Sequence, residues 1–415
     1  MSRAGEHPAS FGEVFAVGEF RALFTAQVLS VAGDQLARVA LALLVFDRTG
    51  SAALTALTYA LTFLPDLIGG PLLSGLADRY RRRELMVLAD LARAALVGLM
   101  AIPGMHIAAL AALLIAVQLI ASPFNAARAA VLPAILEGDR FVVGQGIINI
   151  TYQVAQLGGY LSGGILVKLL GPSAALGIDA ATFLVSALLV RFGLRDRPVP
   201  PDTDAETRQR TTLSSLRAGA RLVWHNRMLR ALVCIACVSG FYVVAEGLAV
   251  PYADELKGGA VIAALLFAAP PAGNIVGMLV LTRLVAPATR MRLIGPLAIG
   301  ACAVLIGCAA DPGVAVTVGL FVLSGVGAAY QTAASAAFVK AVPDAQRGQA
   351  FGLALTSMRV AQGLGVVVAG LIADGVAPSL VVAGAGAVGT VVALFAAGSL
   401  SRARTAATSP VGVTH

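Results

Sequence analysis

Long apolar segments alternate with short polar ones along almost the whole chain. Each apolar segment has about 20 residues or more, the length that an α-helix needs to cross a hydrocarbon core of about 30 Å. The pattern predicts twelve such helices, at residues 22–46, 52–77, 84–103, 107–133, 141–170, 172–193, 230–253, 259–285, 292–310, 313–338, 346–373 and 377–399. We therefore expect an all-α membrane protein, because helices satisfy their backbone groups internally in lipid.

One polar stretch is much longer than the others and separates two blocks of six predicted spans. The expected parts are an N-terminal bundle, a cytoplasmic linker, a C-terminal bundle and a cytoplasmic tail, at 1–193, 194–229, 230–400 and 401–415. Within the linker, apolar side chains recur at helical spacing opposite Arg217 and Arg221. They are Leu213, Leu216, Ala220, Val223 and Trp224. This favours an amphipathic helix on the membrane surface, with a flexible linker as the alternative.

The composition agrees with a membrane protein. Of 415 residues, 58% are hydrophobic and only 13% are charged, whereas soluble domains carry about 25% charged residues. The opening stretch lacks the short apolar core and the cleavage site of a secretory signal, so we expect a mature cytoplasmic leader.

The positive charges predict the orientation, because Lys and Arg in short loops stay on the cytoplasmic side. With the first residues inside, most of the 30 Lys and Arg residues fall in inner loops. The exceptions, three in outer loops and four within spans, are Arg48, Lys168 and Lys257, and Arg38, Arg93, Arg128 and Arg359. Both termini are therefore expected inside. The net charge of +8 comes from arginines in loops that lie beside anionic lipid. The sequence contains no basic domain that could bind a nucleic-acid duplex.

The two halves of the chain resemble each other. The fifth predicted span contains YQVAQLGGYLSGGIL (152–166), and the eleventh contains MRVAQGLGVVVAGLI (358–372), 206 residues further on. The matching residues are Val154, Ala155, Gln156, Gly159 and Gly164 with Val360, Ala361, Gln362, Gly365 and Gly370. The match predicts two six-helix bundles of the same orientation, related by a pseudo-two-fold axis along the membrane normal. Chance similarity between apolar helices is the alternative.

Residues 74–83, SGLADRYRRR, resemble the signature loop between spans two and three of the major facilitator superfamily, usually written G-x-L-a-D-R-x-G-R-R/K. Ser74 and Arg81 replace its two glycines. The matching residues are Asp78, Arg79, Arg82 and Arg83. The resemblance implies the major facilitator fold and a cytoplasmic gate, in which the aspartate meets a helix N-terminus of the other half and the arginines pair with nearby acids. A purely topological anchor is the alternative, but it would not need the aspartate.

A second motif, residues 159–164, is similar to the G-P-x-x-G-G motif of drug–proton exporters, with Tyr160 where proline is usual. Glycines at this density also let helices approach closely. The helix-packing candidates are Gly159, Gly163, Gly164, Gly365 and Gly370. The spans around the motif resemble the bacterial siderophore-exporter and macrolide-efflux branch, at GDQLA (33–37), PFNAARAAVLP (123–133) and LGIDAATF (176–183). The resemblance implies export. The arginine that many drug–proton exporters carry early in span four is missing, since Arg128 comes late, and this puts a copied proton relay in doubt.

Four ionisable residues within the predicted spans are candidates for proton coupling: Asp34, Arg38, Asp66 and Glu246. A charge at the bilayer centre costs about 2.5–3.5 kcal/mol or more, so such residues are usually functional. Asp34 and Arg38 share one helix face, and Glu246 lies in the span equivalent to theirs in the repeat. The alternatives are a permanent pair between Asp34 and Arg38, a position of Glu246 near the outer end of its span, and a capping or kinking role for Asp66.

Three other charged residues within spans are expected to hold helices together: Asp90, Arg93 and Asp179. Uncharged polar residues suggest the path of the cargo, with a stripe on the fifth span that climbs about 16 Å. The candidate cavity residues are Gln27, Gln145, Asn149, Gln153, Gln156, Asn274, Tyr330 and Gln331. Hydrogen bonding between helices is the alternative role. A cavity that mixes apolar and hydrogen-bonding surface suits amphiphilic molecules.

Residues for other kinds of site are missing from the sequence. Cys234 and Cys237 lie inside a span without a histidine nearby, so we expect buried thiols, as for Cys302 and Cys308, and no metal. The P-loop motif of ATPases does not occur.

Together these patterns predict a secondary transporter rather than an enzyme. It would act as a monomer in the bacterial inner membrane without a cofactor, and its partners would be a small-molecule cargo, protons and membrane lipid. The expected activity is export of a small amphiphilic compound in exchange for protons. An importer or a uniporter is the nearest alternative. A receptor or enzyme would need a soluble domain or a catalytic dyad, and a channel would need a ring of charges or a filter loop.

Overall fold

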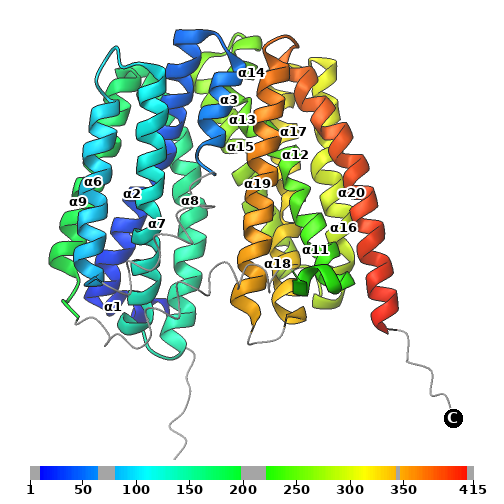
Figure 1. Cartoon of the computed structure of the whole chain (residues 1–415), viewed down its shortest axis with the longest axis horizontal. Coiled ribbons are helices and arrows are strands. Elements are labelled where there is room, and N and C mark those ends of the chain that lie inside the picture. Colours follow the sequence, from blue (N-terminus) through cyan, green and yellow to red (C-terminus); the bar gives the residue numbers. More distant parts are fainter. Residues whose placement is uncertain (1–9, 64–79, 198–220, 343–345, 409–415) are drawn as a thin grey trace, which may run out of the picture. The chain divides into compact units, whose positions relative to one another are not determined.

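The computed structural model describes residues 10–63, 80–197, 221–342 and 346–408 (Figure 1), and these residues form helices and connecting turns without a strand. Nine of the described helices are long and apolar enough to cross a membrane. They span Gly18–Thr49, Ile107–Ile135, Pro172–Gly193, Arg227–Gly247, Gly259–Arg283, Thr289–Ala310, Gly313–Ala341, Ala350–Ala373 and Pro378–Thr405. The all-α membrane class is therefore confirmed, and the number of twelve spans stays a prediction.

Three predicted spans differ from this set. Those at 84–103 and 141–170 are present as the helices α6 (Arg82–Met100) and α8 (Asp139–Leu170), which the set does not include. The span at 52–77 begins as α3 (Ala52–Ala60), and residues 64–79 lie outside the described part of the chain. The predicted linker helix also falls mainly outside the described residues.

The chain divides into two compact units, and the first comprises Met1–Leu44 and Pro65–Thr203. Its described helices are α1 (Phe11–Ala16), most of α2 (Gly18–Thr49), α6, α7 (Ile107–Ile135), α8 and α9 (Pro172–Gly193). α6 packs extensively against α7 and α9. Local signals set the boundaries: Ser10 caps α1, and Gly171, with a φ of 83°, separates α8 from α9.

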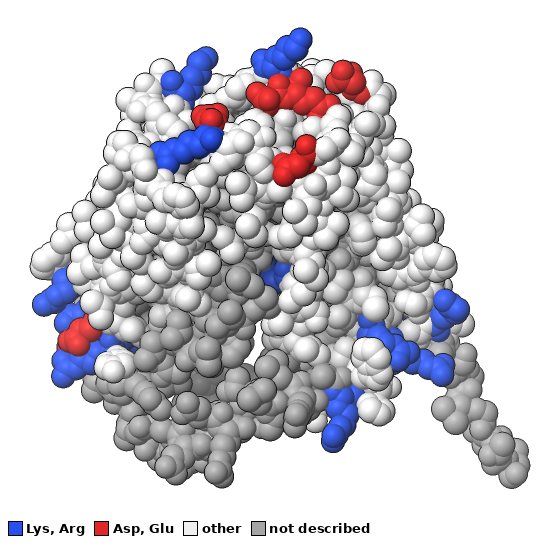
Figure 2. Space-filling model, turned by 45° about the horizontal axis from the view of Figure 1, so that its top comes forward, with Lys and Arg blue, Asp and Glu red and all other residues white. Residues whose placement is uncertain are grey.

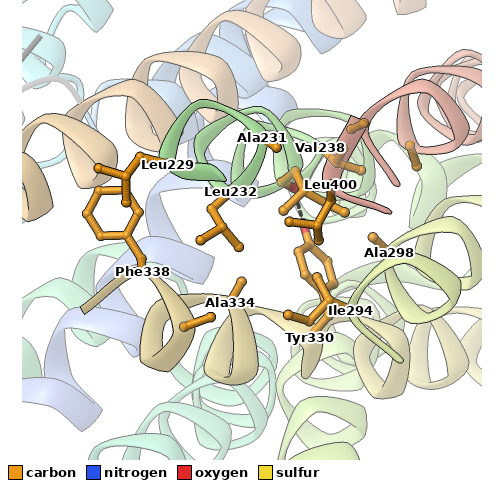
Figure 3. Close-up of a cluster of buried hydrophobic side chains, with 14 of the residues drawn as sticks. Leu229, Ala231, Leu232, Val238, Ile294, Ala298, Tyr330, Ala334, Phe338 and Leu400 are labelled. Carbon is orange, nitrogen blue, oxygen red and sulfur yellow. Dashed lines mark hydrogen bonds between the residues drawn. The ribbon is translucent and has the colours of Figure 1, made fainter. Parts of the chain in front are cut away.

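The second unit comprises Val45–Leu64 and Asp204–His415. Its helices are α3, α11 (Arg227–Cys237), α12 (Ser239–Tyr242), α13 (Val244–Gly247), α14 (Ala249–Glu255), α15 (Gly259–Arg283), α16 (Pro287–Ala303), the 3₁₀-helix η1 (Val304–Ala310), α17 (Gly313–Ala328), α18 (Tyr330–Ala341), α19 (Arg347–Ala373) and α20 (Pro378–Thr408). Side chains from α11, α16, α18 and α20 form one of its apolar cores, which includes Leu232, Ile294, Tyr330 and Leu400 (Figure 3).

The seventh predicted span, residues 230–253, contains four short helices, α11 to α14, which follow one another through single residues that keep near-helical dihedral angles, Val238, Val243 and Leu248. Its backbone tightens at several points, where Val238 N donates to Ile235 O, Phe241 N to Val238 O and Glu246 N to Val243 O. These bonds between residues three apart alternate with regular bonds four residues apart, such as Val243 N to Ser239 O and Gly247 N to Val243 O.

Most charged side chains on the face drawn in Figure 2 gather near the helix ends, and only one basic side chain is visible near the middle of this view. The side chains exposed on the described helices are largely apolar, including Leu188, Leu279 and Phe395. This distribution fits helices that face lipid.

Candidate functional site

A charged cluster lies inside the first unit, where α2 and α6 meet. Nη2 of Arg93 on α6 lies 2.9 and 3.0 Å from the two carboxylate oxygens of Asp34 on α2. Nη1 of Arg93 lies 3.8 Å from Oδ1 of Asp90, and Ser186 of α9 donates a 2.5 Å hydrogen bond to the other oxygen of Asp90. Arg93 and Asp90 are buried, whereas 31% of the Asp34 side chain is exposed. Asp34 is therefore the member that solvent can reach.

Asp179 of α9 adds a third carboxylate to this cluster. It is buried, and its Oδ1 accepts a hydrogen bond from Thr182. A Cβ at Gly33 would lie 2.3 Å from that oxygen, so the glycine is what lets α9 approach α2. The ring of Phe183 covers the Arg93 guanidinium at 3.9 Å. The cluster joins α2, α6 and α9, as expected for Asp90, Arg93 and Asp179.

Arg38, whose permanent pairing with Asp34 was the alternative to a coupling role, lies near a different group. Its Nη1 donates to the Tyr160 hydroxyl at 3.5 Å, while Asp34 pairs with Arg93. Gln27, a candidate cavity residue, accepts a hydrogen bond from Arg128 through its Oε1. Helical spacing pointed to Arg38, but it cannot reveal a partner on another helix.

The predicted gate lies partly outside the described residues, together with Asp66, Asp78 and Arg79. Arg82 donates to Ala130 O at 3.0 Å and Arg83 to Leu194 O at 3.4 Å. Asp196 accepts from Arg81 at 2.7 Å and lies 3.5 Å from Arg83. An acid therefore does lie beside these arginines, as the resemblance implied.

Glu246 lies on α13 in the second unit. Tyr59 of α3 donates a 2.5 Å hydrogen bond to its Oε2. Tyr59 is buried and also packs against Phe63 and Phe267. The sequence analysis missed Tyr59, because nothing in the local pattern links residues 187 positions apart.

A helix cap nearby was also missed. Asp374, which follows α19, accepts from Ser51 Oγ at 3.1 Å and from the backbone N–H of Ala53 at 3.0 Å, both at the start of α3. A Cβ at Gly370 would lie 2.4 Å from Ala56, so α3 and α19 pack closely. A carboxylate at a helix N-terminus is stabilised by the free N–H groups there.

Gln331 and Tyr330 begin α18 and bond to the seventh span. The Tyr330 hydroxyl donates to Ile235 O at 2.9 Å. Nε2 of Gln331 lies 3.1 Å from Ala236 O, 3.1 Å from the Tyr330 hydroxyl and 3.3 Å from that of Tyr242. Two of the predicted cavity residues are thus brought together with Tyr242, which the sequence analysis did not select.

The other cavity candidates lie on α8 in the first unit and on α15 in the second. On α8, Gln145 and Asn149 are exposed and Gln153 and Gln156 are half-buried. All four side chains therefore keep some surface that the first unit does not cover. Oδ1 of Asn274 on α15 is buried without a hydrogen bond from the described residues. The proposed cargo contacts of these residues stay predictions.

The glycines of the predicted packing motif allow close helix contacts. A Cβ at Gly159 would lie 2.5 Å from Ala32 O, and one at Gly163 would lie 3.2 Å from the Cα of Leu36, both on α2. Gly164 is buried. A Cβ at Gly365 of α19 would lie 2.0 Å from Gly240 O.

The cysteines differ in part from the expectation. Cys302 and Cys308 are buried and Cys237 is half-buried, but Cys234 is exposed because it lies on the outer side of α11. All four thiols are free, and the described residues contain no group of three or more potential metal ligands.

Solved structures of transporters share the fold. The nucleoside transporter NupG has a TM-score of 0.73 and 16% identity, covering 93% of this chain and 99% of that one. The POT family transporter PepTSo has a TM-score of 0.71 and 13% identity, covering 93% and 98%. A bacterial homologue of the iron transporter ferroportin, in an inward-facing state, has a TM-score of 0.67 and 14% identity, covering 94% and 100%.

Sequence relatives are closer. The chain is 28% identical over 266 residues to the uncharacterized MFS-type transporter YvqJ of Bacillus subtilis, covering 61% of this chain and 62% of that protein. It is 29% identical over 238 residues to the multidrug efflux pump Tap of Mycobacterium tuberculosis, covering 54% and 56%. The chain thus spans about three fifths of the length of the curated relatives it matches. The family model of the Major Facilitator Superfamily matches residues 23–316, and the chain therefore belongs to that superfamily.

Proposed function

We propose that the chain is a twelve-helix secondary transporter that exports a small amphiphilic molecule in exchange for protons by alternating access. Membership of the superfamily supports transport. Export is supported by the resemblance to the siderophore-exporter and macrolide-efflux branch and by the 29% identity to the efflux pump Tap. Two six-helix bundles, both termini in the cytoplasm and a monomeric state are parts of the same proposal.

One observation carries the proton coupling: Asp34 is the solvent-accessible carboxylate of an otherwise buried ionic cluster. Protonation of Asp34 would remove its charge and weaken its contact with Arg93, which lies 2.9 Å away. Arg93 would then turn toward the remaining carboxylates, Asp90 and Asp179. Since these residues come from α2, α6 and α9, a proton at Asp34 would change how three helices are held together.

Glu246 is the second proposed coupling residue. Its hydrogen bond from Tyr59 connects α13 with α3, and Asp374 caps the same helix α3. Protonation of the carboxylate would weaken a bond to a hydroxyl donor, because charged acceptors form stronger hydrogen bonds than neutral ones. We assign the cytoplasmic gate to Asp78 with Arg79, Arg82 and Arg83, on the resemblance of residues 74–83 to the signature loop, with Arg38 and Asp66 as further coupling candidates.

A flux assay tests the proposed coupling. The protein is reconstituted in liposomes, a pH gradient is imposed, and the lumenal pH is followed while amphiphilic compounds are added. We expect proton movement that requires both the compound and the carboxylates, so that Asp34→Asn and Glu246→Gln each lower the coupled rate by at least about tenfold, the effect of losing a proton-transfer group. Asp311→Asn, in an exposed loop, is the matched control and keeps the rate.

The opposite result supports the second candidate function. If a compound moves equally well without the gradient and in both variants, proton coupling is wrong and the chain is a uniporter. Net uptake against the compound's own gradient would instead support an importer.

A further inference from the structure

Two backbone carbonyls of the seventh span, next to its first tightened turn, accept hydrogen bonds from side chains in the interior of the second unit. Ile235 O accepts from Tyr330, and Ala236 O accepts from Ser239 and from Gln331. Irregular backbone at membrane depth is tolerated where protein groups satisfy it or where it lines a cavity.

The hydrogen bond to Ala236 O fixes the orientation of the Gln331 carboxamide. Ala236 O can only accept a hydrogen bond, so the group that faces it must be the NH₂ and not the oxygen. The two N–H bonds are shared among Ala236 O and the hydroxyls of Tyr330 and Tyr242. Among the described residues, no hydrogen bond is recorded for Oε1. The NH₂ group of the Gln331 carboxamide is therefore held by hydrogen bonds, and Oε1 of the same carboxamide can accept a hydrogen bond from a ligand.

A pocket lies beside this acceptor, enclosed by α11, α18 and α19. It is open on one side and has a cavity volume of about 70 Å³, and Gln331 is part of its lining. Its walls are otherwise mainly apolar: Leu232, Phe338, Phe351, Leu355 and Met358. Figure 3 shows Leu232, Ala334 and Phe338 around a common space. No charged side chain belongs to the described lining.

We propose that this pocket binds the cargo by an apolar group of about the size of an aromatic ring, which carries one N–H or O–H donor for Gln331 Oε1. An anionic group is disfavoured in the pocket, because the described lining supplies no cation and, beside Gln331, only the hydroxyl of Ser335 as a polar side chain. Met358 and the phenyl rings of Phe338 and Phe351 can adapt to several ring shapes. The inference rests on the proposed export of amphiphiles and narrows the cargo to neutral or cationic molecules with such a group.

Two dyes that differ in one donor test the pocket. N-phenyl-1-naphthylamine is an apolar probe with a single N–H group, and its N-methyl derivative has none. Both are titrated, with fluorescence detection, against the full-length protein in lipid nanodiscs, and the signal of empty nanodiscs is subtracted. We expect saturable binding of both dyes, about tenfold tighter for the N–H dye, the typical effect of one hydrogen bond to a partly buried acceptor.

Three variants separate the hydrogen bond from the apolar walls. Gln331→Leu removes the whole carboxamide and keeps a branched apolar side chain that is one atom shorter, and it should bind both dyes with equal affinity. If the preference arose only from steric exclusion of the methyl group, it would persist in this variant. Ala354→Phe fills the pocket from α19 without touching the polar residues and should abolish saturable binding of both dyes. Ala387→Phe, at an exposed position of α20, is its control and should bind like the wild type.

Several results would overturn the inference. Equal affinity of the wild type for both dyes, or a preference that survives in Gln331→Leu, rules out the hydrogen bond. Unchanged binding in Ala354→Phe rules out the pocket, and a lack of saturable binding in the wild type rules out the ligand class. Because binding is measured without a pH gradient, a failure of proton coupling in the flux assay leaves these results unaffected.

Discussion

One guanidinium compensates most of the buried negative charge in the described part of the first unit. Arg93 lies close to Asp34 and Asp90, and Asp179 is buried on the neighbouring helix. Uncompensated buried charge is costly, so the effect of removing one member depends on what remains behind. The same cluster therefore contains residues whose substitution should have very different consequences.

Arg93→Met should strongly destabilise the protein. It leaves the buried carboxylate of Asp90 without its cation, and breaking a buried pair in this way costs about 3–5 kcal/mol. Asp34→Asn keeps a hydrogen-bond acceptor for Arg93 at a partly exposed site, so we expect a cost of about 1 kcal/mol. The midpoints of thermal unfolding in detergent compare the two variants. Similar midpoints would mean that Arg93 does not compensate the cluster.

The sequence identified the charged residues of this cluster but not their contacts. Asp34, Asp90, Arg93 and Asp179 stand out because each interrupts an apolar run. The contact between Asp34 and Arg93 joins helices that are 59 residues apart, and only packing determines it. The hydrogen bond from Tyr59 to Glu246 was hidden for the same reason.

Close helix contacts in both units depend on glycines, which have no side chain. At Gly159 a Cβ would meet the backbone of α2, whereas the neighbouring Gly158 faces open space. At Gly365 a Cβ would meet the backbone of α12. Because backbone atoms cannot yield as a flexible side chain can, these positions limit how closely two helices pack.

Gly159→Ala should destabilise the protein by about 1–3 kcal/mol, since overpacking forces α8 away from α2. Gly158→Ala, one position earlier in the same helix, should be neutral or stabilising by up to about 1 kcal/mol, because alanine favours the helix and meets no neighbour. Thermal unfolding of the two variants measures the difference. The close approach of α8 and α2 would be refuted if both alanines had the same effect.

Asp374→Ala should loosen the first turn of α3. Loss of a helix cap costs about 0.5–2 kcal/mol, which corresponds to roughly two- to thirtyfold faster amide hydrogen exchange near Ala53. Asp374→Asn keeps an acceptor and should show a smaller effect. Exchange at Ser379, whose N–H bonds to Glu255 at the start of α20, serves as the internal control and should not change. Unchanged exchange near Ala53 would show that the cap does not stabilise this turn.

Most helices could be predicted as elements, because long apolar runs bounded by Gly, Pro or polar residues leave few alternatives. The tightened turns of the seventh span could not. Residues 230–253 read as one regular apolar helix, and the hydrogen bonds that Tyr330 and Gln331 make to it from α18 are not visible in that pattern. The local sequence pattern of a helix cannot show which side chains from another helix donate hydrogen bonds to its backbone carbonyls.

The whole molecule was recognised from a few local motifs, chiefly residues 74–83 and the glycine motif of the fifth span. The family match over residues 23–316 confirms that recognition. Motifs identify a family because its gate and packing sites require particular residues. They do not identify the cargo, which binds through ordinary apolar and polar side chains.

Labelling of introduced cysteines tests the orientation of the chain. In a variant without the four native cysteines, a reagent that does not cross membranes should label Gly375→Cys on intact cells. Glu137→Cys and Ser401→Cys should react only after the cells are opened, because positively charged loops stay inside. Labelling of the last two on intact cells would reverse the predicted topology. All three positions are exposed, so burial does not explain a difference between them.

The tightened turns of the seventh span also affect where a helix of the second unit can bend. A continuous α-helix is stiff because every bend strains a regular ladder of hydrogen bonds. Between Ile235 and Leu248 the N–H groups of Val238, Phe241 and Glu246 bond to the carbonyl three residues back, so the regular ladder is locally tightened there, although other bonds four residues apart persist. The seventh span is therefore expected to bend most easily within α12 and α13. Tyr242 and Glu246 both lie in this segment, so a bend there would move both side chains.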